Sequence, residues 1–147
     1  PNPQTLVMSE GPAGGRSGDR KPQPQSWMGY SIGRTNFNLE AVMLRHKGQI
    51  RAGLYIAGDQ AKALFYLLQE QKEEIENEIG SVLQWEELAS ARDSRIALYL
   101  SDLDPDNERD WPRQHDWLAS KVNDFHRVFR ERVRLLDADQ WREGIEI

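Results

Sequence analysis

The sequence contains no cysteine, and this absence removes several classes of protein at once. Without cysteine there is no disulfide framework, no thiol nucleophile and no thiolate metal site. The chain also has no apolar run near the roughly 20 residues of a membrane-spanning helix, and no signal-peptide pattern. We therefore expect a cytoplasmic protein that does not contact a membrane.

Histidine is scarce, and the three histidines do not have the spacing of a metal site. His115 and His126 are eleven residues apart, roughly 16 Å along a helix, which is too far for one metal ion. His46 lies far from both in the sequence. Glycine-rich phosphate loops and the nucleophile elbow Gly-x-Ser-x-Gly are also missing. We expect no catalytic residues, no cofactor and no metal, and hence a non-enzymatic protein.

Two partial matches to metal-dependent chemistry fail in their details. Asp102, Asp104 and Asp106 alternate as in a calcium loop, but Asn107 and Arg113 occupy the positions that need Gly and Glu. A metal-dependent nuclease needs Glu-x-Lys on a strand, whereas the segment 70–72, Glu-Gln-Lys, lies within a predicted helix. A nuclease-like fold without catalytic activity stays open as an alternative, and a purely antiparallel sheet would argue against it.

Prolines and glycines are concentrated at the start of the chain. Residues 1–25 hold five of the seven prolines and four of the eleven glycines. We interpret residues 1–26 as a flexible linker, residues 27–137 as one domain, and residues 138–147 as a C-terminal tail. With 147 residues and 38% hydrophobic residues, the chain suits one domain with a modest core.

Hydrophobic periodicity predicts an α+β fold. Apolar residues alternate over 28–32, 37–43 and 50–56, and shorter apolar runs follow at 82–88 and 96–100, which indicates five strands. Helical spacing covers 59–79, with Asp59 as the N-cap, and 108–136. The order is βββ-α-ββ-α, and we expect a mostly antiparallel sheet packed against two amphipathic helices. The pattern does not show whether Trp27 and Trp141 are exposed.

A cluster of cations near the C-terminus suggests nucleic-acid binding as an alternative function. The net charge is −5, yet residues 121–134 carry five cations against two anions. A basic helix can contact nucleic-acid phosphates, so the alternative nucleic-acid contacts on it are Lys121, Arg127, Arg130 and Arg134. Arg34, in the segment Gly33-Arg34-Thr35-Asn36 between two predicted strands, is a further candidate for an anion, although a turn explains that segment more simply.

Several segments, in order, resemble a known family. They include PQSWMGYSIGRTNFNLEAVM, IRAGLYIAG, FYLLQEQKEEIENEIG, LQWEEL and SRIALYL, and a helix beginning near WPRQHDWL. Over about residues 20–136 the chain resembles the bacterial family known as domain of unknown function 4268. The resemblance implies a C-terminal portion of a longer bacterial protein, in some members behind a nuclease-like domain, and it supplies no catalytic residues.

The sequence therefore leads to one main hypothesis. We expect an interaction or accessory domain of a bacterial protein, associated by analogy with a nuclease or a defence system. Its partner would be another protein or the remainder of a longer chain, and the oligomeric state is open. The alternatives are nucleic-acid binding through the basic last helix and the inactive nuclease-like fold.

Overall fold

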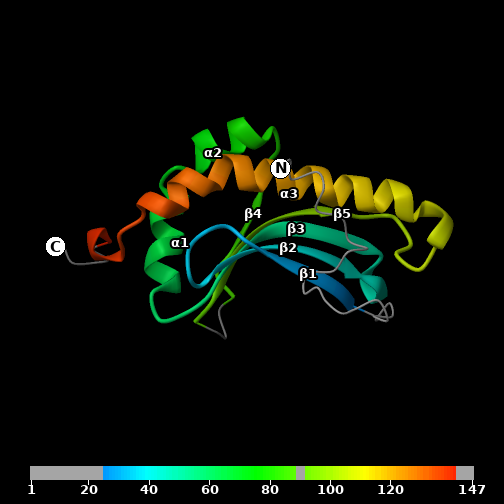
Figure 1. Ribbon diagram of the computed structural model, residues 1–147, viewed down its shortest axis with the longest axis horizontal. Helices are drawn as coiled ribbons and strands as arrows, with labels where there is room; N and C mark the ends of the chain where they lie inside the picture. The colour runs from blue at the N-terminus through cyan, green and yellow to red at the C-terminus, as the bar shows by residue number, and fades with distance from the viewer. Residues whose placement is uncertain (1–24, 89–91, 142–147) are drawn as a thin grey trace.

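The computed structural model describes residues 25–88 and 92–141, with side chains from Met28 onward. Its five strands form one sheet with the order β1-β2-β3-β5-β4 (Figure 1). Each neighbouring pair is antiparallel. The strands are β1 (Gln25–Ser31), β2 (Phe37–Leu44), β3 (Gln49–Ile56), β4 (Gln84–Glu86) and β5 (Ser94–Leu100).

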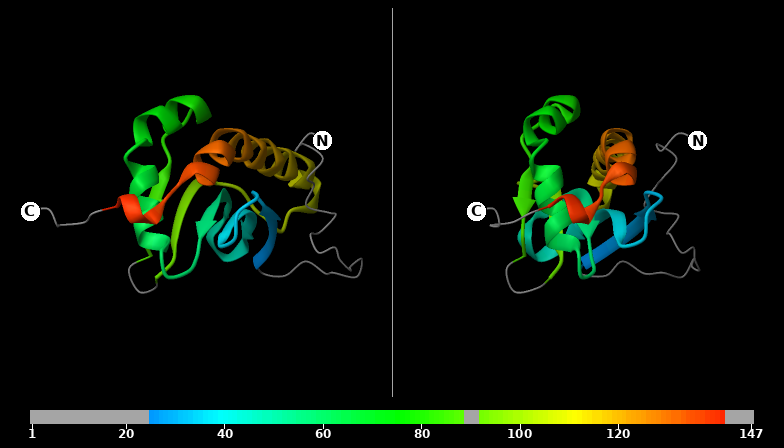
Figure 2. Two further views of the ribbon diagram at one scale, coloured as in Figure 1. Left: turned by 60° about the vertical axis from the view of Figure 1, so that its left-hand side comes forward. Right: turned by 90° about the vertical axis from the view of Figure 1, so that its left-hand side faces the viewer.

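Three α-helices pack on the sheet. They are α1 (Ala61–Gln69), α2 (Lys72–Ile79) and α3 (Trp111–Leu135). Figures 1 and 2 show α2 and α3 on one side of the sheet, with α3 running across it. Short 3₁₀ turns complete the fold: η4 (Arg45–Lys47), η5 (Glu108–Asp110) and η6 (Ala138–Gln140). No helix among the described residues is long and apolar enough to span a bilayer.

The core lies between the helices and one face of the sheet. Successive side chains of a strand point to opposite faces, so every second residue of β3 enters the core: Ile50, Ala52, Leu54 and Ile56 are all fully buried. From α3, Phe125 and Phe129 stack at 5.4 Å between ring centroids and meet this face. Burying each such side chain contributes roughly 1.5–3 kcal/mol.

The predicted fold class is confirmed. The sheet has five strands, the order of α-helices and strands is βββ-αα-ββ-α, and the helices pack against the predicted apolar face. All four strand pairings are antiparallel, which counts against the nuclease-like alternative.

The predicted helix 59–79 is wrong in one respect, because it is two helices. The α-helix ends at Gln69, and Gln71 adopts φ −104° and ψ 18° before α2 begins. Arg132 of α3 donates a hydrogen bond to the Gln71 side chain at 2.9 Å and also binds Glu78, so the break lets α2 turn toward α3. The N-cap of α1 is Gln60 rather than Asp59, whose carboxylate instead pairs with Arg92.

The structured part of the chain extends beyond both ends of the predicted domain 27–137. The strand β1 begins at Gln25, and the rest of the predicted linker lies outside the described residues. At the other end η6 contacts α1, and Trp141 packs on Tyr66 with ring centroids 5.0 Å apart. The described part of the predicted tail, residues 138–141, is therefore attached to the domain. The side chain of Trp27 lies outside the described residues.

Candidate interaction surface

No helix among the described residues covers the second face of the sheet (Figure 2). Several strand residues on this face are polar. Because side chains alternate along each strand, the residues between the core positions point to this face. Six of them, each buried or half-buried, form what we call the polar sheet face: Glu40, Arg51, Tyr55, Glu86, Arg95 and Tyr99.

The two central strands supply this face with the same five-residue pattern. In β3 the segment 51–55 reads Arg-Ala-Gly-Leu-Tyr, and in β5 the segment 95–99 reads Arg-Ile-Ala-Leu-Tyr. The strands are antiparallel, and their register places Arg51 opposite Tyr99 and Tyr55 opposite Arg95. Two equivalent Arg–Tyr pairs therefore lie side by side, related by an approximate local two-fold axis.

Small residues separate the two Arg–Tyr pairs. Gly53 is paired with Ala97 at the centre of the face. A Cβ atom on Gly53 would lie 2.6 Å from the carbonyl oxygen of Ile96 and 3.1 Å from Ala97 Cα, so only glycine fits this close approach of the strands. Because Gly53 and Ala97 have little or no side chain, longer side chains on either side of them can come together: Glu86 accepts hydrogen bonds from both Arg95 and Tyr99.

Hydrogen bonds hold the face in one arrangement. Arg51 Nη2 donates to Glu40 Oε1 at 3.1 Å, and its guanidinium lies 5.8 Å from the centre of the Tyr99 ring. The Tyr99 hydroxyl donates to Glu86 Oε2 at 2.6 Å, and Arg95 Nε donates to Glu86 Oε1 at 2.7 Å. Connected contacts thus run from β2 to β4. The Arg51 side chain is only 13% exposed, and its Nε atom is buried without a hydrogen-bond partner among the described residues.

Burial and hydrogen bonds shift the pKa values of Tyr55, Tyr99 and Arg95 on this face. Burial and the hydrogen bond to Glu86 raise the pKa of Tyr99, so its hydroxyl stays protonated. A hydrogen bond to Asp93 and burial raise the pKa of Tyr55 in the same way. Burial opposes the charge of Arg95, but its bond to Glu86 wins and raises the pKa of Arg95. These shifts keep the two tyrosine hydroxyls as hydrogen-bond donors and Arg95 as a cation.

The predicted nucleic-acid residues of α3 face carboxylates on their own helix. Lys121 Nζ lies 3.9 Å from Asp124, and Arg127 Nη2 lies 3.2 Å from the same carboxylate. Arg134 forms an ion pair with Glu131, three residues before it. Arg130 is exposed on the same helix. Much of the predicted positive charge is therefore balanced locally, and contact with nucleic acid stays a prediction.

Arg34 is engaged by the protein itself. Its Nη1 atom donates to the carbonyl oxygens of Val133 at 2.8 Å and Leu136 at 2.9 Å, at the C-terminal end of α3. The guanidinium also lies 5.5 Å from the centre of the Phe37 ring. The surrounding segment is a turn, as predicted, with Gly33 at φ 95° and Asn36 at φ 74°. An open depression of about 570 Å³ adjoins it and brings Arg34 together with Asp59. Anion binding by Arg34 stays a prediction.

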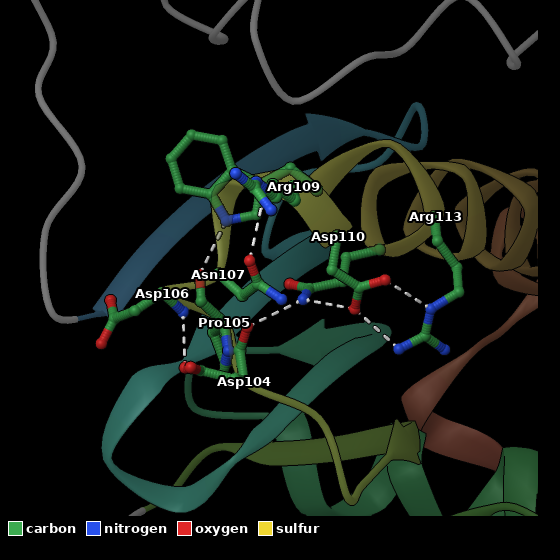
Figure 3. Close-up of polar contacts among 9 residues, drawn as sticks. Asp104, Pro105, Asp106, Asn107, Arg109, Asp110 and Arg113 are labelled. Atoms are coloured by element: carbon green, nitrogen blue, oxygen red, sulfur yellow. Dashed lines mark hydrogen bonds and ion pairs between the residues drawn. The ribbon is translucent and has the colours of Figure 1, made fainter.

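The acidic loop before α3 is held by hydrogen bonds within the loop and to the helix (Figure 3). The Asp110 carboxylate accepts from Arg113 at 2.7 and 2.8 Å and from Gln114 at 2.9 Å, and these bonds lower the pKa of Asp110 to about 2. Gln114 is fully buried and also donates to the backbone carbonyl of Asp104. In the described part of the chain, no three Asp, Glu or His side chains are grouped to hold a metal ion.

Sequence reasoning missed the polar sheet face although its signal was present. The sequence analysis noted the strands of β3 and β5 for their apolar residues, and the polar residues between them follow the same alternation. The shared Arg-x-x-Leu-Tyr spacing could have identified the face once antiparallel pairing was assumed. The register that puts each Arg opposite a Tyr is visible only in the structure.

Comparison with known proteins gives one match. No curated protein and no solved structure matches the chain. A family model described as "Domain of unknown function (DUF4268)" matches residues 7–133, which span all five strands and most of α3. The family suggested by the sequence is therefore confirmed, and the chain belongs to the DUF4268 family.

Proposed function

We propose that the chain is a non-enzymatic interaction domain of a bacterial protein, acting in the cytoplasm, and that its polar sheet face contacts a protein partner. The observation that carries this proposal is that the register of β3 and β5 places two Arg–Tyr pairs opposite one another on this face. An association with a nuclease or a defence system is the wider setting in which we place such a domain, by analogy with longer proteins of the family.

The residue types of the face support protein recognition. Arginine and tyrosine are enriched among the residues that dominate binding energy at protein interfaces. Here Arg51, Arg95 and Tyr99 are held by carboxylates before any partner arrives. Side chains that are already ordered lose less conformational entropy on binding, which favours affinity.

The charge balance favours a protein over a nucleic acid. Arg51 and Arg95 are each paired with a glutamate, and Asp93 adds a further carboxylate beside Tyr55. Phosphate backbones bind surfaces with an excess of cations, and this face has none. A protein surface that offers amide groups, hydroxyl groups and an aromatic or aliphatic anchor fits its mixture of charges and rings.

Site-specific photo-crosslinking in the cell of origin tests this proposal. A benzophenone amino acid at Gln84 would place the probe at an exposed position of β4, on the polar sheet face and paired with Ala97. The matched control is the same probe at Asp116, an exposed position of α3. We expect a discrete protein adduct from position 84 only, and we expect Tyr99→Ala to abolish it. Equal adducts at both positions, or none at position 84, would contradict the proposal.

Binding assays with labelled DNA and RNA separate the nucleic-acid alternative. If α3 binds phosphates, anisotropy will show affinity that falls steeply with salt, and Arg127→Gln and Arg130→Gln will weaken it. We expect no such binding at physiological salt. The same samples with added Mg²⁺, analysed on a gel, test the proposal that the domain is not an enzyme. Cleavage of the nucleic acid that a substitution in this domain abolishes would overturn that proposal.

A further inference from the structure

The polar sheet face carries side-chain amides and carboxylates on both sides of its central Arg–Tyr pairs. Strand pairing aligns the residues of this face in rows that run across β2, β3, β5 and β4. One row consists of Glu40, Gly53, Ala97 and Gln84, and the next consists of Asn38, Tyr55, Arg95 and Glu86. Each of these rows therefore has a carboxylate at one end and an amide at the other, and the ends are reversed between the two rows.

This arrangement is complementary to itself about one axis. A two-fold axis in the contact plane, parallel to the strands and midway between β3 and β5, places a second copy face to face with the first. The rotation keeps every row and exchanges β3 with β5 and β2 with β4, so each residue meets the residue at the mirrored position of its own row. An in-plane axis along the row of Glu40 is unsuitable, because it places Glu40 across from Glu40 of the second copy.

We propose that the partner of the polar sheet face is the same face of a second copy of this chain, packed about the axis parallel to the strands. This inference rests on the proposed function, in which the face contacts a protein. Arg51 then lies across from Tyr99 of the second copy, and Arg95 lies across from Tyr55. A guanidinium group over a tyrosine ring is an attractive contact, and among these four residues no arginine faces another arginine.

The outer residues of the rows complete the match. Glu40 lies across from Gln84 of the second copy, and Glu86 lies across from Asn38, so each carboxylate meets an amide that can donate a hydrogen bond. Asn38 and Gln84 are both exposed, so their amides are accessible to a second copy. The eight residues that meet in this way include two arginines and two glutamates, so neither copy brings an excess of one charge.

The centre of the contact allows the two sheets to approach. Gly53 lies across from Ala97 of the second copy, so the residues nearest the axis have little or no side chain. Sheets packed face to face lie about 10 Å apart, with strand directions within about 30° of each other. A rotation of that size displaces the residues nearest the axis least. The helices α2 and α3 lie on the other side of the sheet, so they stay on the outside of both copies (Figure 2).

Sedimentation velocity of the purified chain measures the proposed dimer. A polar interface of ordinary size belongs at the weak end of the affinity range, so we expect a dissociation constant of about 1–100 μM. Over a concentration series that brackets this range, the weight-average mass should rise from 17.0 kDa towards twice that value. The benzophenone probe at Gln84 should also crosslink the purified chain to a second copy of itself.

One exposed position gives two variants with opposite expected effects. Because Gln84 lies across from Glu40, Gln84→Glu brings two carboxylates together and should weaken dimerisation about tenfold, whereas Gln84→Lys brings opposite charges together and should strengthen it about threefold. Each substitution acts twice, since the contact is two-fold symmetric. The matched controls are Ser120→Glu and Ser120→Lys, at an exposed position of α3, and both should dimerise as the unmodified chain does. Circular dichroism checks that all four variants are folded.

A monomeric mass at every concentration would overturn this inference, and so would a dimer that the two Gln84 variants change equally or not at all. If the purified chain is monomeric while position 84 crosslinks in the cell to a protein of another mass, the partner is a different protein. In that case this inference falls and the proposed function stands. Absence of any adduct from position 84 in the cell overturns the proposed function, and with it this inference.

Discussion

Arg34 links two parts of the fold that are a hundred residues apart, and its loss should measurably destabilise the protein. The last carbonyl groups of an α-helix have no partner within the helix. Arg34 Nη1 donates to two carbonyls at the end of α3 at 2.8 and 2.9 Å: that of Val133, which also accepts a 3.3 Å bond from the Leu136 N–H, and that of Leu136. A cation in this position also interacts favourably with the negative end of the helix dipole. The substitution Arg34→Met removes both effects while keeping a similar apolar stem.

The expected magnitude follows from these contacts. A hydrogen bond to a charged group contributes about 1.5–3 kcal/mol when buried. Arg34 is half-buried and both bonds share one nitrogen, so we discount their sum to about 2–3 kcal/mol for Arg34→Met. With a urea m-value of about 1.5 kcal/mol/M, the unfolding midpoint should fall by roughly 1.3–2 M. Arg34→Lys keeps the charge but not the planar donor geometry, and it should lose about half as much.

Equilibrium unfolding in urea, followed by tryptophan fluorescence, measures these changes. Arg130→Met is the matched control, because Arg130 is an exposed cation on the same helix, and its free energy of unfolding should change by less than about 0.5 kcal/mol. A change of that small size for Arg34→Met would refute the reasoning. If Arg34 instead serves to bind an anion, added phosphate will stabilise the unmodified chain more than Arg34→Met; we expect equal effects.

Two further predictions concern single positions. Gly53→Ala should lower the free energy of unfolding by about 2–4 kcal/mol, because the new Cβ meets backbone atoms of β5 at 2.6 and 3.1 Å; a loss below about 0.5 kcal/mol in urea unfolding would contradict this. Asp110 has a pKa of about 2 against an ordinary value of 3.8, so its contribution to stability is complete above pH 3.8 and is lost as the pH falls towards 2. Asp110→Asn should therefore show a shallower loss of stability between pH 4 and pH 2, and an unchanged slope would show that its contacts do not form in solution.

Periodicity was sufficient for the architecture of this chain but not for its connections. Alternating apolar residues identified β2 and β3 because every second residue of each strand enters the hydrophobic core. The break between α1 and α2 was not visible, because Leu68 and Ile75 keep helical spacing across it. At the break, the Gln71 side chain accepts a hydrogen bond from Arg132, which lies 61 residues later and also binds Glu78. A local pattern contains no information about a partner so distant in the chain.

The same limit explains why the sequence analysis chose the cations of α3 as candidate residues and not the residues of the polar sheet face. A cluster of cations such as the one on α3 is visible in the sequence, but the carboxylates that balance it become neighbours only once helical geometry places residues three apart together. Conversely, Arg51 and Tyr99 are 48 positions apart, and a shift of one residue in the pairing of β3 and β5 would turn them to opposite faces. Register is fixed by the packing of the whole sheet, so the sequence pattern alone does not place each Arg of the polar sheet face opposite a Tyr.

Stability alone does not explain the charged groups of that face, and this distinction can be tested. Largely buried ion pairs such as Arg51–Glu40 offset much of their attraction by desolvation, and apolar residues of similar volume often serve stability equally well. The double variant Arg51→Met/Glu40→Leu should therefore unfold within about 1 kcal/mol of the unmodified chain, whereas Glu40→Leu alone leaves an unpaired cation and should cost about 2 kcal/mol. If the pair serves recognition, the stable double variant will still lose the crosslinked adduct from position 84. Retention of the adduct would show that Arg51 and Glu40 do not contribute to binding.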